Sequence, residues 1–335
     1  MSQFSSSLLF FFTLLSGSIL SISSSSWFGA WIGLELNLMS FVPLITMKLN
    51  SHLSEAALKY FLIQALSSTI IILSSSLLLT IPHLSSTLLL LALFMKLGAA
   101  PLHFWFPTII QGLYWPQAIL LMTIQKLAPM FLISYLMFNN LLIYLTFLSS
   151  ILCALMGALG GLNVMKLPKI MAFSSINHMA WMMIGIALND TSWILYFLLY
   201  SIISSSVIMM FYLFKAYSLS HLMMSNHHNP LILLSTPIAL LSLGGLPPFT
   251  GFFPKLLMMQ TMINNMVLVP LFFLLFSTLI TLYFYTRIII SFLLLTSPSI
   301  SLKTKQTSST SLLTMSPYIL FFNTLGLIIT PMFLL

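Results

Sequence analysis

The sequence predicts an all-α polytopic membrane protein with about eleven transmembrane helices. Hydrophobic residues make up 59% of its 335 residues, and charged residues make up 4%. A soluble domain carries about 25% charged residues, so this chain has too few polar side chains to cover a water-facing surface. Its long apolar runs suit helices of about 20 residues. They lack the period-two alternation of a membrane β-barrel.

Each predicted span is an apolar run bounded by polar or turn-forming residues. In order, the spans are 8–24, 27–47, 56–80, 85–112, 116–138, 142–163, 169–188, 192–215, 231–264, 267–294 and 314–333. The fourth and ninth runs are too long for one helix, and glycine and proline interrupt them near 98–101 and near 244–248. No basic residue precedes the first run, so we expect a permanent helix there rather than a signal peptide. We expect flexible loops at 218–230 and 296–311.

The basic residues of the loops all fall on one side of this predicted topology. The loops after spans 2, 6, 8 and 10 hold Lys48, Lys166, Lys169, Lys215, Lys303 and Lys305. The loops after the odd-numbered spans hold no Lys or Arg, but carry His83 and Asp190. By the positive-inside rule, the N-terminus lies inside and the C-terminus outside.

Several classes of site are not supported by the sequence. The net charge of +8 comes from scattered residues, which form no nucleic-acid patch. Cys153 is the one cysteine, which excludes an internal disulfide and a Cys-ligated cluster. No glycine-rich nucleotide motif is present. His221, His227 and His228 have no acidic or cysteine partner nearby, so we interpret them as a solvated loop. We therefore expect no cofactor or metal site in this chain.

Four charged side chains lie deep inside the apolar runs, namely Glu35, Lys96, Lys126 and Lys255. A charge in mid-membrane costs about 2.5–3.5 kcal/mol on insertion scales, and such residues typically mark ion or proton paths. Lys96 lies just before the first interruption and Lys255 follows the second, and interrupted helices are a pointer to a transport site. Lysine and glutamate can exchange protons, whereas arginine stays charged. The alternative is that these charges only form structural ion pairs.

Two histidines, His103 and His178, are candidates for bridging positions in a proton path, or are hydrogen-bonded packing groups. The charges near the ends of the spans are interpreted as structural. Glu55 and Lys59 form a local helix pair, Asp190 caps a helix, and the Arg287 side chain is expected to reach the interface.

Seven segments together resemble one family. They are SSSSWFGAWIGLELNLMSFVPLI (23–45), LKYFLIQALSS (58–68), FMKLGAAPLHFWFP (94–107), QKLAPM (125–130), GALGGLN (157–163), MAFSSINHMAW (171–181) and SLGGLPPFTGFFPK (242–255). The chain resembles the subunit 2 family of mitochondrial NADH:ubiquinone oxidoreductase, respiratory complex I, in its insect-like versions. The resemblance covers nearly the whole chain and weakens after about residue 290.

The resemblance implies an antiporter-like subunit with two inverted five-helix repeats and broken helices. Within the single membrane domain 1–335, the repeats would be 8–138 and 142–294, followed by an inside loop and a C-terminal helix in 295–335. It also implies a proton relay: Glu35 matches the family's glutamate, Lys96 its ion-pair lysine, Lys126 its central lysine, Lys255 the lysine of the second broken helix, and His103 and His178 the histidines of its hydrophilic axis.

The resemblance further implies that NAD, FMN, iron–sulfur clusters and ubiquinone bind to partner subunits and not to this chain. The expected partners are neighbouring antiporter-like and small membrane-arm subunits, and lipids such as cardiolipin. The expected location is the mitochondrial inner membrane, with the N-terminus in the matrix and the C-terminus in the intermembrane space. Our hypothesis is a proton-translocating subunit of this enzyme, without redox chemistry of its own. The alternatives are a structural spacer and a stand-alone sodium/proton antiporter subunit.

Overall fold

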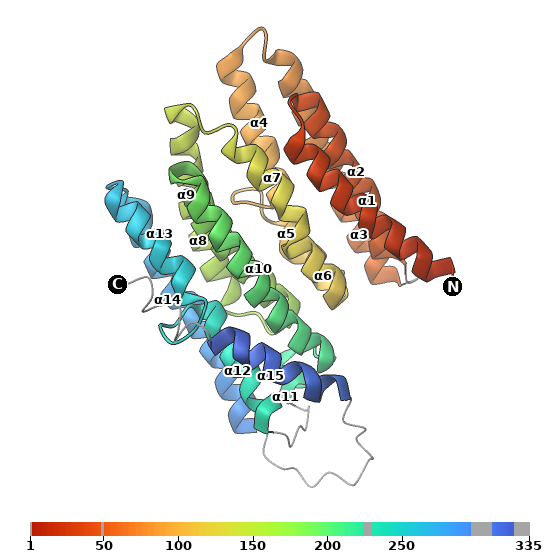
Figure 1. Ribbon diagram of the computed structural model, residues 1–335, viewed down its shortest axis with the longest axis vertical. Coiled ribbons are helices and arrows are strands. Elements are labelled where there is room, and N and C mark those ends of the chain that lie inside the picture. The colour runs from red at the N-terminus through yellow and green to blue at the C-terminus, as the bar shows by residue number, and fades with distance from the viewer. Residues whose placement is uncertain (1, 48–49, 224–229, 296–309, 325–335) are drawn as a thin grey trace. The chain divides into compact units, whose positions relative to one another are not determined.

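A computed structural model of the chain describes residues 2–47, 50–223, 230–295 and 310–324 (Figure 1). Within these ranges the regular structure consists of fifteen α-helices, and the only β pairing is a single bridge between Lys166 and Ser218. Within the described residues, eight helical stretches are long and apolar enough to cross a membrane, and one of them, Trp115–Ser134, is bent at Thr123. The predicted all-α polytopic membrane fold is confirmed.

The chain divides into two compact units, Met1–Met156 and Gly157–Leu335. The first unit contains α1 (Ser2–Ser23), α2 (Trp27–Thr46), α3 (Ser51–Leu77), α4 (Pro82–Leu97), α5 (Trp105–Gly112), α6 (Trp115–Met122) and α7 (Ile124–Ser134). Helix α8 (Asn140–Gly161) begins in the first unit and ends in the second. The second unit contains α9 (Leu167–Leu188), α10 (Asp190–Leu213), α11 (Leu219–Met223), α12 (Pro230–Gly244), α13 (Phe252–Asn264), α14 (Leu268–Leu295) and α15 (Thr310–Thr324).

Each predicted span corresponds to one helix or to two helices in series. Both predicted interruptions are present, between α4 and α5 and between α12 and α13. A third interruption was not predicted: α6 and α7 meet at Thr123, whose φ of −112° and ψ of −82° are not helical. The Thr123 hydroxyl donates to the Ile119 carbonyl at 2.7 Å, a contact that bends helices. The part of the last predicted span beyond residue 324 lies outside the described residues.

The prediction of a flexible loop over 218–230 is wrong for its first part. Leu219–Met223 forms the short helix α11, and Ser218 pairs with Lys166. The two connections that contain Lys166 and Lys215 therefore lie side by side. Pro230 begins α12, and Thr310 and Ser311 begin α15, so the ends of the two predicted loops are helical as well. Residues 224–229 and 296–309 fall outside the described ranges, and so do Lys48, His227, His228, Lys303 and Lys305.

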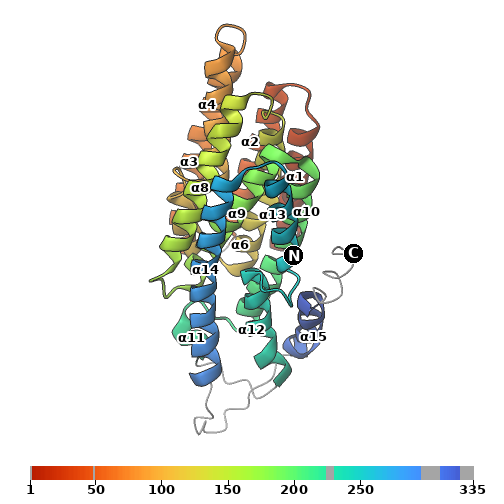
Figure 2. The ribbon, with the colours of Figure 1, turned by 90° about the vertical axis from the view of Figure 1, so that its left-hand side faces the viewer.

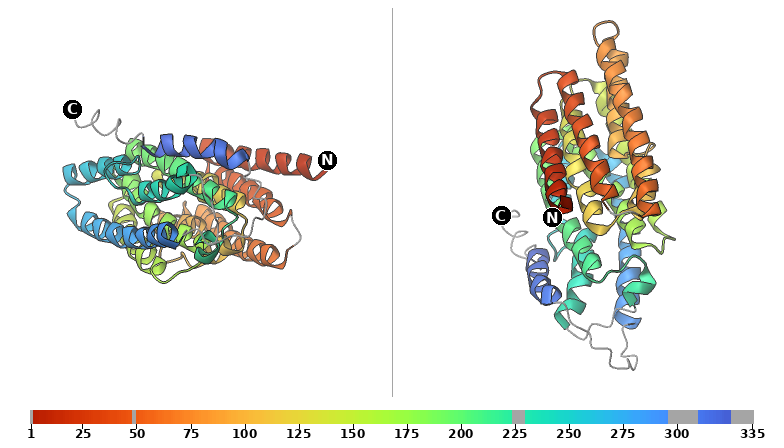
Figure 3. Two further views of the ribbon diagram at one scale, coloured as in Figure 1. Left: turned by 90° about the horizontal axis from the view of Figure 1, so that it is seen from below. Right: turned by 90° about the vertical axis from the view of Figure 1, so that its right-hand side faces the viewer.

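Small residues allow the first helices to pack closely. Helices α1 and α2 lie against each other, and α3 packs against α2 (Figure 3). A Cβ atom on Gly33 would lie 2.5 Å from the Ser21 nitrogen, and one on Gly17 would lie 2.9 Å from the Gly33 carbonyl oxygen. Close approach through small residues is the usual way that membrane helices associate, because lipid supplies no hydrophobic driving force.

In the second unit, α9 is surrounded by other helices. It is the most buried of the eight long helices, with 89% of its most apolar stretch covered, and α10, α13 and α14 pack against it. Helix α15 lies against α12 (Figure 2). The arrangement shields the polar residues of α9 from lipid.

The first discontinuous helix turns at Gly98, which ends α4 in the left-handed conformation with φ +71°. Glycine is required there by this conformation, and because a Cβ would lie 3.1 Å from the Cβ of Phe106. The freed backbone groups find partners: Trp105 Nε1 donates to the Met95 carbonyl at 3.0 Å, and the Ala100 amide donates to Cys153 Sγ at 3.0 Å. The break is therefore a fixed structure whose backbone is shielded from lipid.

The second discontinuous helix turns at Gly245, which follows α12 with φ +75°. The chain then crosses back so closely that a Cβ on Gly251 would lie 1.7 Å from the Ser242 carbonyl oxygen. The Gly245 amide donates to the carbonyls of Leu241 and Ser242 at 3.1 and 3.0 Å. The predicted interruption near 244–248 is confirmed, and α13 resumes at Phe252.

Candidate functional site

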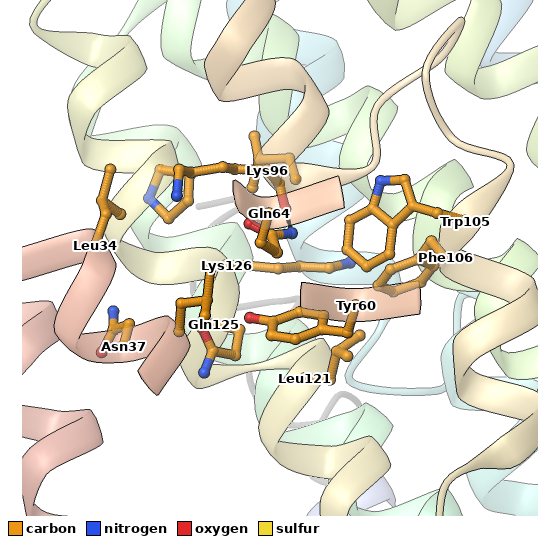
Figure 4. Close-up of a pocket in the computed structure, with 13 residues that line it drawn as sticks. Leu34, Asn37, Tyr60, Gln64, Lys96, Trp105, Phe106, Leu121, Gln125 and Lys126 are labelled. Carbon is orange, nitrogen blue, oxygen red and sulfur yellow. Dashed lines mark hydrogen bonds between the residues drawn. The ribbon is translucent and has the colours of Figure 1, made fainter. Parts of the chain in front are cut away.

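Two of the predicted site lysines line one internal cavity in the first unit (Figure 4). The cavity has a volume of about 20 Å³, which is room for about one water molecule. The lining comes from α2 to α7 and consists of Leu34, Asn37, Leu38, Tyr60, Gln64, Lys96, Leu97, Trp105, Phe106, Leu121, Gln125, Lys126 and Pro129. Lys96 and Lys126 are both buried there. The fold thus brings Lys96 and Lys126, which lie 30 residues apart in the sequence, to the same cavity.

Lys96 lies in the last turn of α4, just before the break. The negative end of a helix dipole favours a cation at this position. Its carbonyl accepts a hydrogen bond from Gln64 Nε2 of α3 at 3.2 Å, in a buried setting. No described residue accepts a hydrogen bond from its ammonium. The backbone of Lys96 is thus held in place while its charged end is left to respond to nearby charges.

Glu35 is the nearby acidic group. It lies on α2, half-buried, and its carboxylate interacts electrostatically with the Lys96 ammonium. Within the described residues, the only ion pair closer than 4.0 Å is that of Glu55 and Lys59, so Glu35 and Lys96 lie farther apart than a direct salt bridge. Glu35 Oε2 is buried, and no described residue donates to it. The pair is electrostatically coupled without being locked together.

Lys126 lies on α7, one turn after the break at Thr123. Its ammonium is 5.0 Å from the centroid of the Phe106 ring, a cation–π contact. Figure 4 shows its side chain reaching toward Phe106 and Trp105. The ammonium also interacts electrostatically with the buried Cys153 thiol, which bonds to the first break. The Phe106 ring can therefore stabilise the Lys126 ammonium although it is not a carboxylate.

His103 lies in the connection between α4 and α5, and its ring is buried against Phe104 at 4.4 Å between centroids. Its Nδ1 is sealed from solvent, and no described residue bonds to it. Neither His103 nor Glu35 lines the cavity that Lys96 and Lys126 share. The structure therefore keeps His103 near the break, but outside the lysine cavity.

His178 lies in the middle of α9 in the second unit. Its Nδ1 is 2.9 Å from the Tyr196 hydroxyl, and its ring lies 5.0 Å from that of Tyr200. These residues line a small cavity of about 10 Å³ together with Ser242 and Gly251 of the α12–α13 region. His178 is thus placed beside the second discontinuous helix.

Lys255 lies in the first turn of α13 and is buried. Its ammonium donates to the Gly244 carbonyl at 2.7 Å, a carbonyl at the end of α12. A Cβ on Gly245 would lie 2.9 Å from Lys255 Nζ, so the side chain folds back across the break. Glycine at 245 is needed both for its backbone conformation and for this contact.

Sequence reasoning missed several neutral polar residues at these sites. Gln64, Gln125, Asn37 and Tyr60 line the lysine cavity. Gln125 Nε2 and Asn37 Oδ1 are buried, and no described residue bonds to either atom. The side-chain amides of Asn37, Gln64 and Gln125 could have indicated this cavity from the sequence, because an amide buried in an apolar helix needs a hydrogen-bond partner.

The remaining charged residues have local roles. Glu55 and Lys59 form the predicted helix pair at 2.5 Å, on the exposed surface. The cap of α10 is Asn189 and not Asp190, since the Asn189 side chain accepts from the Thr191 amide. Asp190 accepts from Trp193 Nε1 instead. Arg287 binds backbone carbonyls, at 2.6 Å to Leu162 and 2.8 Å to Val164.

No group of three or more His, Cys, Asp or Glu that could hold a metal ion is found among the described residues. The described residues instead combine two discontinuous helices with buried lysines and small cavities. This combination is typical of polytopic membrane proteins that transport ions or protons.

The comparisons with known proteins narrow this class. Residues 24–281 match the family described as NADH:quinone oxidoreductase/Mrp antiporter, TM. The chain belongs to this family. It is 44% identical over 299 residues to NADH-ubiquinone oxidoreductase chain 2 of Anopheles gambiae, covering 86% of each chain, and 42% identical over 330 residues to that of Aedes aegypti, covering 96% of each.

A solved structure shares the fold. Respiratory complex I from Thermus thermophilus with bound aureothin contains a chain that superposes with a TM-score of 0.80 at 24% identity. The match covers 93% of this chain and 75% of that one. At this identity the likeness concerns the fold.

Proposed function

We propose that the chain is a proton-translocating, antiporter-like subunit in the membrane arm of a mitochondrial NADH:ubiquinone oxidoreductase. The names of the two mosquito relatives and the family of the chain support this function. The single observation that carries it is the buried lysine beside each of two helix breaks, Lys96 at the first and Lys255 at the second. A break in mid-membrane is a place where polar groups can face a cavity instead of lipid.

In this proposal the redox chemistry takes place in partner subunits. NAD, FMN, iron–sulfur clusters and ubiquinone would bind there, and neighbouring antiporter-like and small subunits would contact this chain. Cardiolipin is a proposed lipid partner for the apolar outer surface. The one-sided distribution of loop lysines supports an N-terminus in the matrix and a C-terminus in the intermembrane space.

The proposed mechanism begins in the first unit. Lys126 takes a proton from the inner side, and its cation–π contact with Phe106 stabilises the charged form. A change in a neighbouring subunit alters the coupling of Glu35 to Lys96. Because Lys96 and Lys126 line one cavity of low dielectric, a change in charge at Lys96 shifts the proton affinity of Lys126.

The second unit supplies the proposed exit groups. Lys255 would accept the proton and release it toward the outer side, and its bond to the Gly244 carbonyl holds the charged form in place. His178 and His103 are proposed as bridging groups. The contact of His178 with the Tyr196 hydroxyl supports its role, because both groups can donate and accept protons.

The substitution Lys126→Met tests the function. In the assembled complex, we expect it to abolish proton pumping coupled to NADH oxidation, because methionine keeps the bulk of the side chain but carries no proton. The measurement is the proton-to-electron ratio in sealed vesicles. Lys59→Met is the matched control, since it removes a lysine from the exposed Glu55 pair and should leave the ratio unchanged.

Full pumping in the Lys126→Met complex would contradict the proposal. The two rival functions give different results. A structural spacer would lose assembled complex in charge-neutral variants and keep its proton-to-electron ratio. A stand-alone sodium/proton antiporter would show sodium-dependent flux without redox partners.

A further inference from the structure

One residue of α15 is buried although its neighbours are not. Asn323 is 1% exposed, whereas Tyr318 is 72% and Phe321 is 65% exposed on the same helix. An amide in an otherwise apolar helix is stable only when its donors and acceptor are bonded. The contacts of Asn323 therefore show what α15 is built to hold.

Every polar group of the Asn323 side chain is used. Nδ2 donates to the Ile319 carbonyl at 2.8 Å and to Ser206 Oγ of α10 at 3.3 Å. Oδ1 accepts from Ser242 Oγ of α12 at 2.6 Å. The carbonyl of Ile319 can only accept, so it fixes which end of the amide carries the hydrogens.

These contacts hold both ends of the second break. Ser242 lies two residues before Gly244, the carbonyl partner of Lys255. On the other side of the break, the Thr250 amide donates to the Asn323 carbonyl at 3.2 Å. Asn323 thus bonds to the chain where it leaves α12 and where it approaches α13.

The backbone around these bonds is tightly packed. The backbone at Gly251 crosses the Ser242 carbonyl too closely to admit a Cβ atom. Ser242 also lines the small cavity that contains His178. A shift of Ser242 would therefore displace the acceptor of Lys255 and reshape the cavity beside His178.

We propose that Asn323 is a positioning residue, through which α15 holds the α12–α13 break in the geometry that binds the Lys255 ammonium. The inference rests on the proposed function of Lys255 and goes beyond it. It gives α15 a part in proton transfer, although this helix contains no Lys, Arg, His, Asp or Glu.

The test uses Asn323→Leu and Ser242→Ala in the full complex. Each variant removes the bond between Asn323 and Ser242 from one side. We expect the proton-to-electron ratio per assembled complex to fall in both variants, and at least as far in Asn323→Leu, which also removes the bond to Ser206. The double variant should fall no further than Asn323→Leu alone. Electron transfer from NADH to ubiquinone should continue. A merely structural role would reduce the amount of assembled complex and leave the ratio unchanged.

The matched control is Ser235→Ala, which removes a buried hydroxyl from α12 two turns before Ser242. Its ratio should equal that of the unmodified protein. If Asn323→Leu does not assemble, Ser242→Ala decides the question, because it deletes a single oxygen atom. An unchanged ratio in Ser242→Ala overturns the inference.

Lys255→Met, measured alongside, distinguishes a failure of the positioning role of Asn323 from a failure of the proposed role of Lys255. If it lowers the ratio while Ser242→Ala does not, only the positioning role of Asn323 is overturned. If Lys255→Met itself leaves the ratio unchanged, both the proposed role of Lys255 and the inference built on it are overturned.

Discussion

The two discontinuous helices use the same device in opposite order. In the first, the lysine precedes the break, and the left-handed glycine follows it at Gly98. In the second, the left-handed glycine comes first, at Gly245, and Lys255 follows. The lysines also differ in their bonds: Lys255 donates to the Gly244 carbonyl, whereas the ammonium of Lys96 has no hydrogen-bond acceptor among the described residues.

This difference suggests separate tasks for the two breaks. At the first, Trp105 and Cys153 bond to the freed backbone groups, so the Lys96 ammonium is left to interact with Glu35. At the second, a freed carbonyl is bonded to the lysine itself. A lysine coupled only to charge can respond to a change in charge, while a lysine bound to a carbonyl is held at a defined place.

The largest expected effect comes from filling the tightest crossing. Gly251→Ala places a Cβ 1.7 Å from the Ser242 carbonyl oxygen, so the backbone must move. We expect destabilisation at or above about 3 kcal/mol, the upper end for overpacking, and little assembled complex. Gly98→Ala should cost less, about 1–2 kcal/mol for a left-handed alanine. The amount of assembled complex, measured on native gels, should be lower for Gly251→Ala than for Gly98→Ala. Equal amounts would show that the two breaks tolerate an added Cβ atom equally.

The lysines themselves provide the next comparison. Lys255→Met leaves the buried Gly244 carbonyl without its donor, whereas Lys96→Met breaks no hydrogen bond of the ammonium. The thermal stabilities of the two variants should differ by about 1.5–3 kcal/mol, the value of a bond to a charged group, with Lys255→Met the less stable. Thermal denaturation of the purified complexes measures this. Equal stabilities would show that the Gly244 bond contributes nothing.

A smaller effect is expected at the first break. Trp105→Phe keeps an aromatic ring but removes the bond from Nε1 to the Met95 carbonyl. We expect a loss of about 1 kcal/mol, typical of one neutral hydrogen bond, and a modest fall in proton pumping. The matched control is Phe138→Leu, because Phe138 is largely exposed and lies in the same unit. No change in Trp105→Phe would mean that the break is held without this bond.

The smallest effect is expected on the surface. Glu55→Gln removes an exposed pair with Lys59, and such pairs contribute little. Neither stability nor the proton-to-electron ratio should change measurably. A loss of proton pumping in Glu55→Gln would show that the functional site includes residues away from the two breaks.

The sequence predicted the features that have a strong local signal. Apolar runs and their Gly-Pro interruptions identified the helices and both breaks, and the high cost of membrane charge singled out the buried lysines. The neutral polar partners were not predicted. Gln64 bonds to Lys96 across 32 residues, and Asn323 bonds to Ser242 across 81. Nothing within a single helix indicates such partners, because the contact exists only in the folded chain.

The break at Thr123 was missed for a related reason. Threonine is tolerated in apolar helices, and it bends a helix only where its hydroxyl donates to a carbonyl of the preceding turn, as Thr123 does to Ile119. The sequence holds no glycine or proline at that point. Pro129 lies six residues later and remains inside α7.

The proton path through both breaks is tested most directly by the proton-to-electron ratio of the Lys96→Met and Lys255→Met complexes, each compared with the unmodified complex in sealed vesicles. We predict that both ratios fall while electron transfer continues, because each lysine serves the same proton path from its own break. If both variants keep the ratio of the unmodified complex, neither lysine takes part in proton transfer.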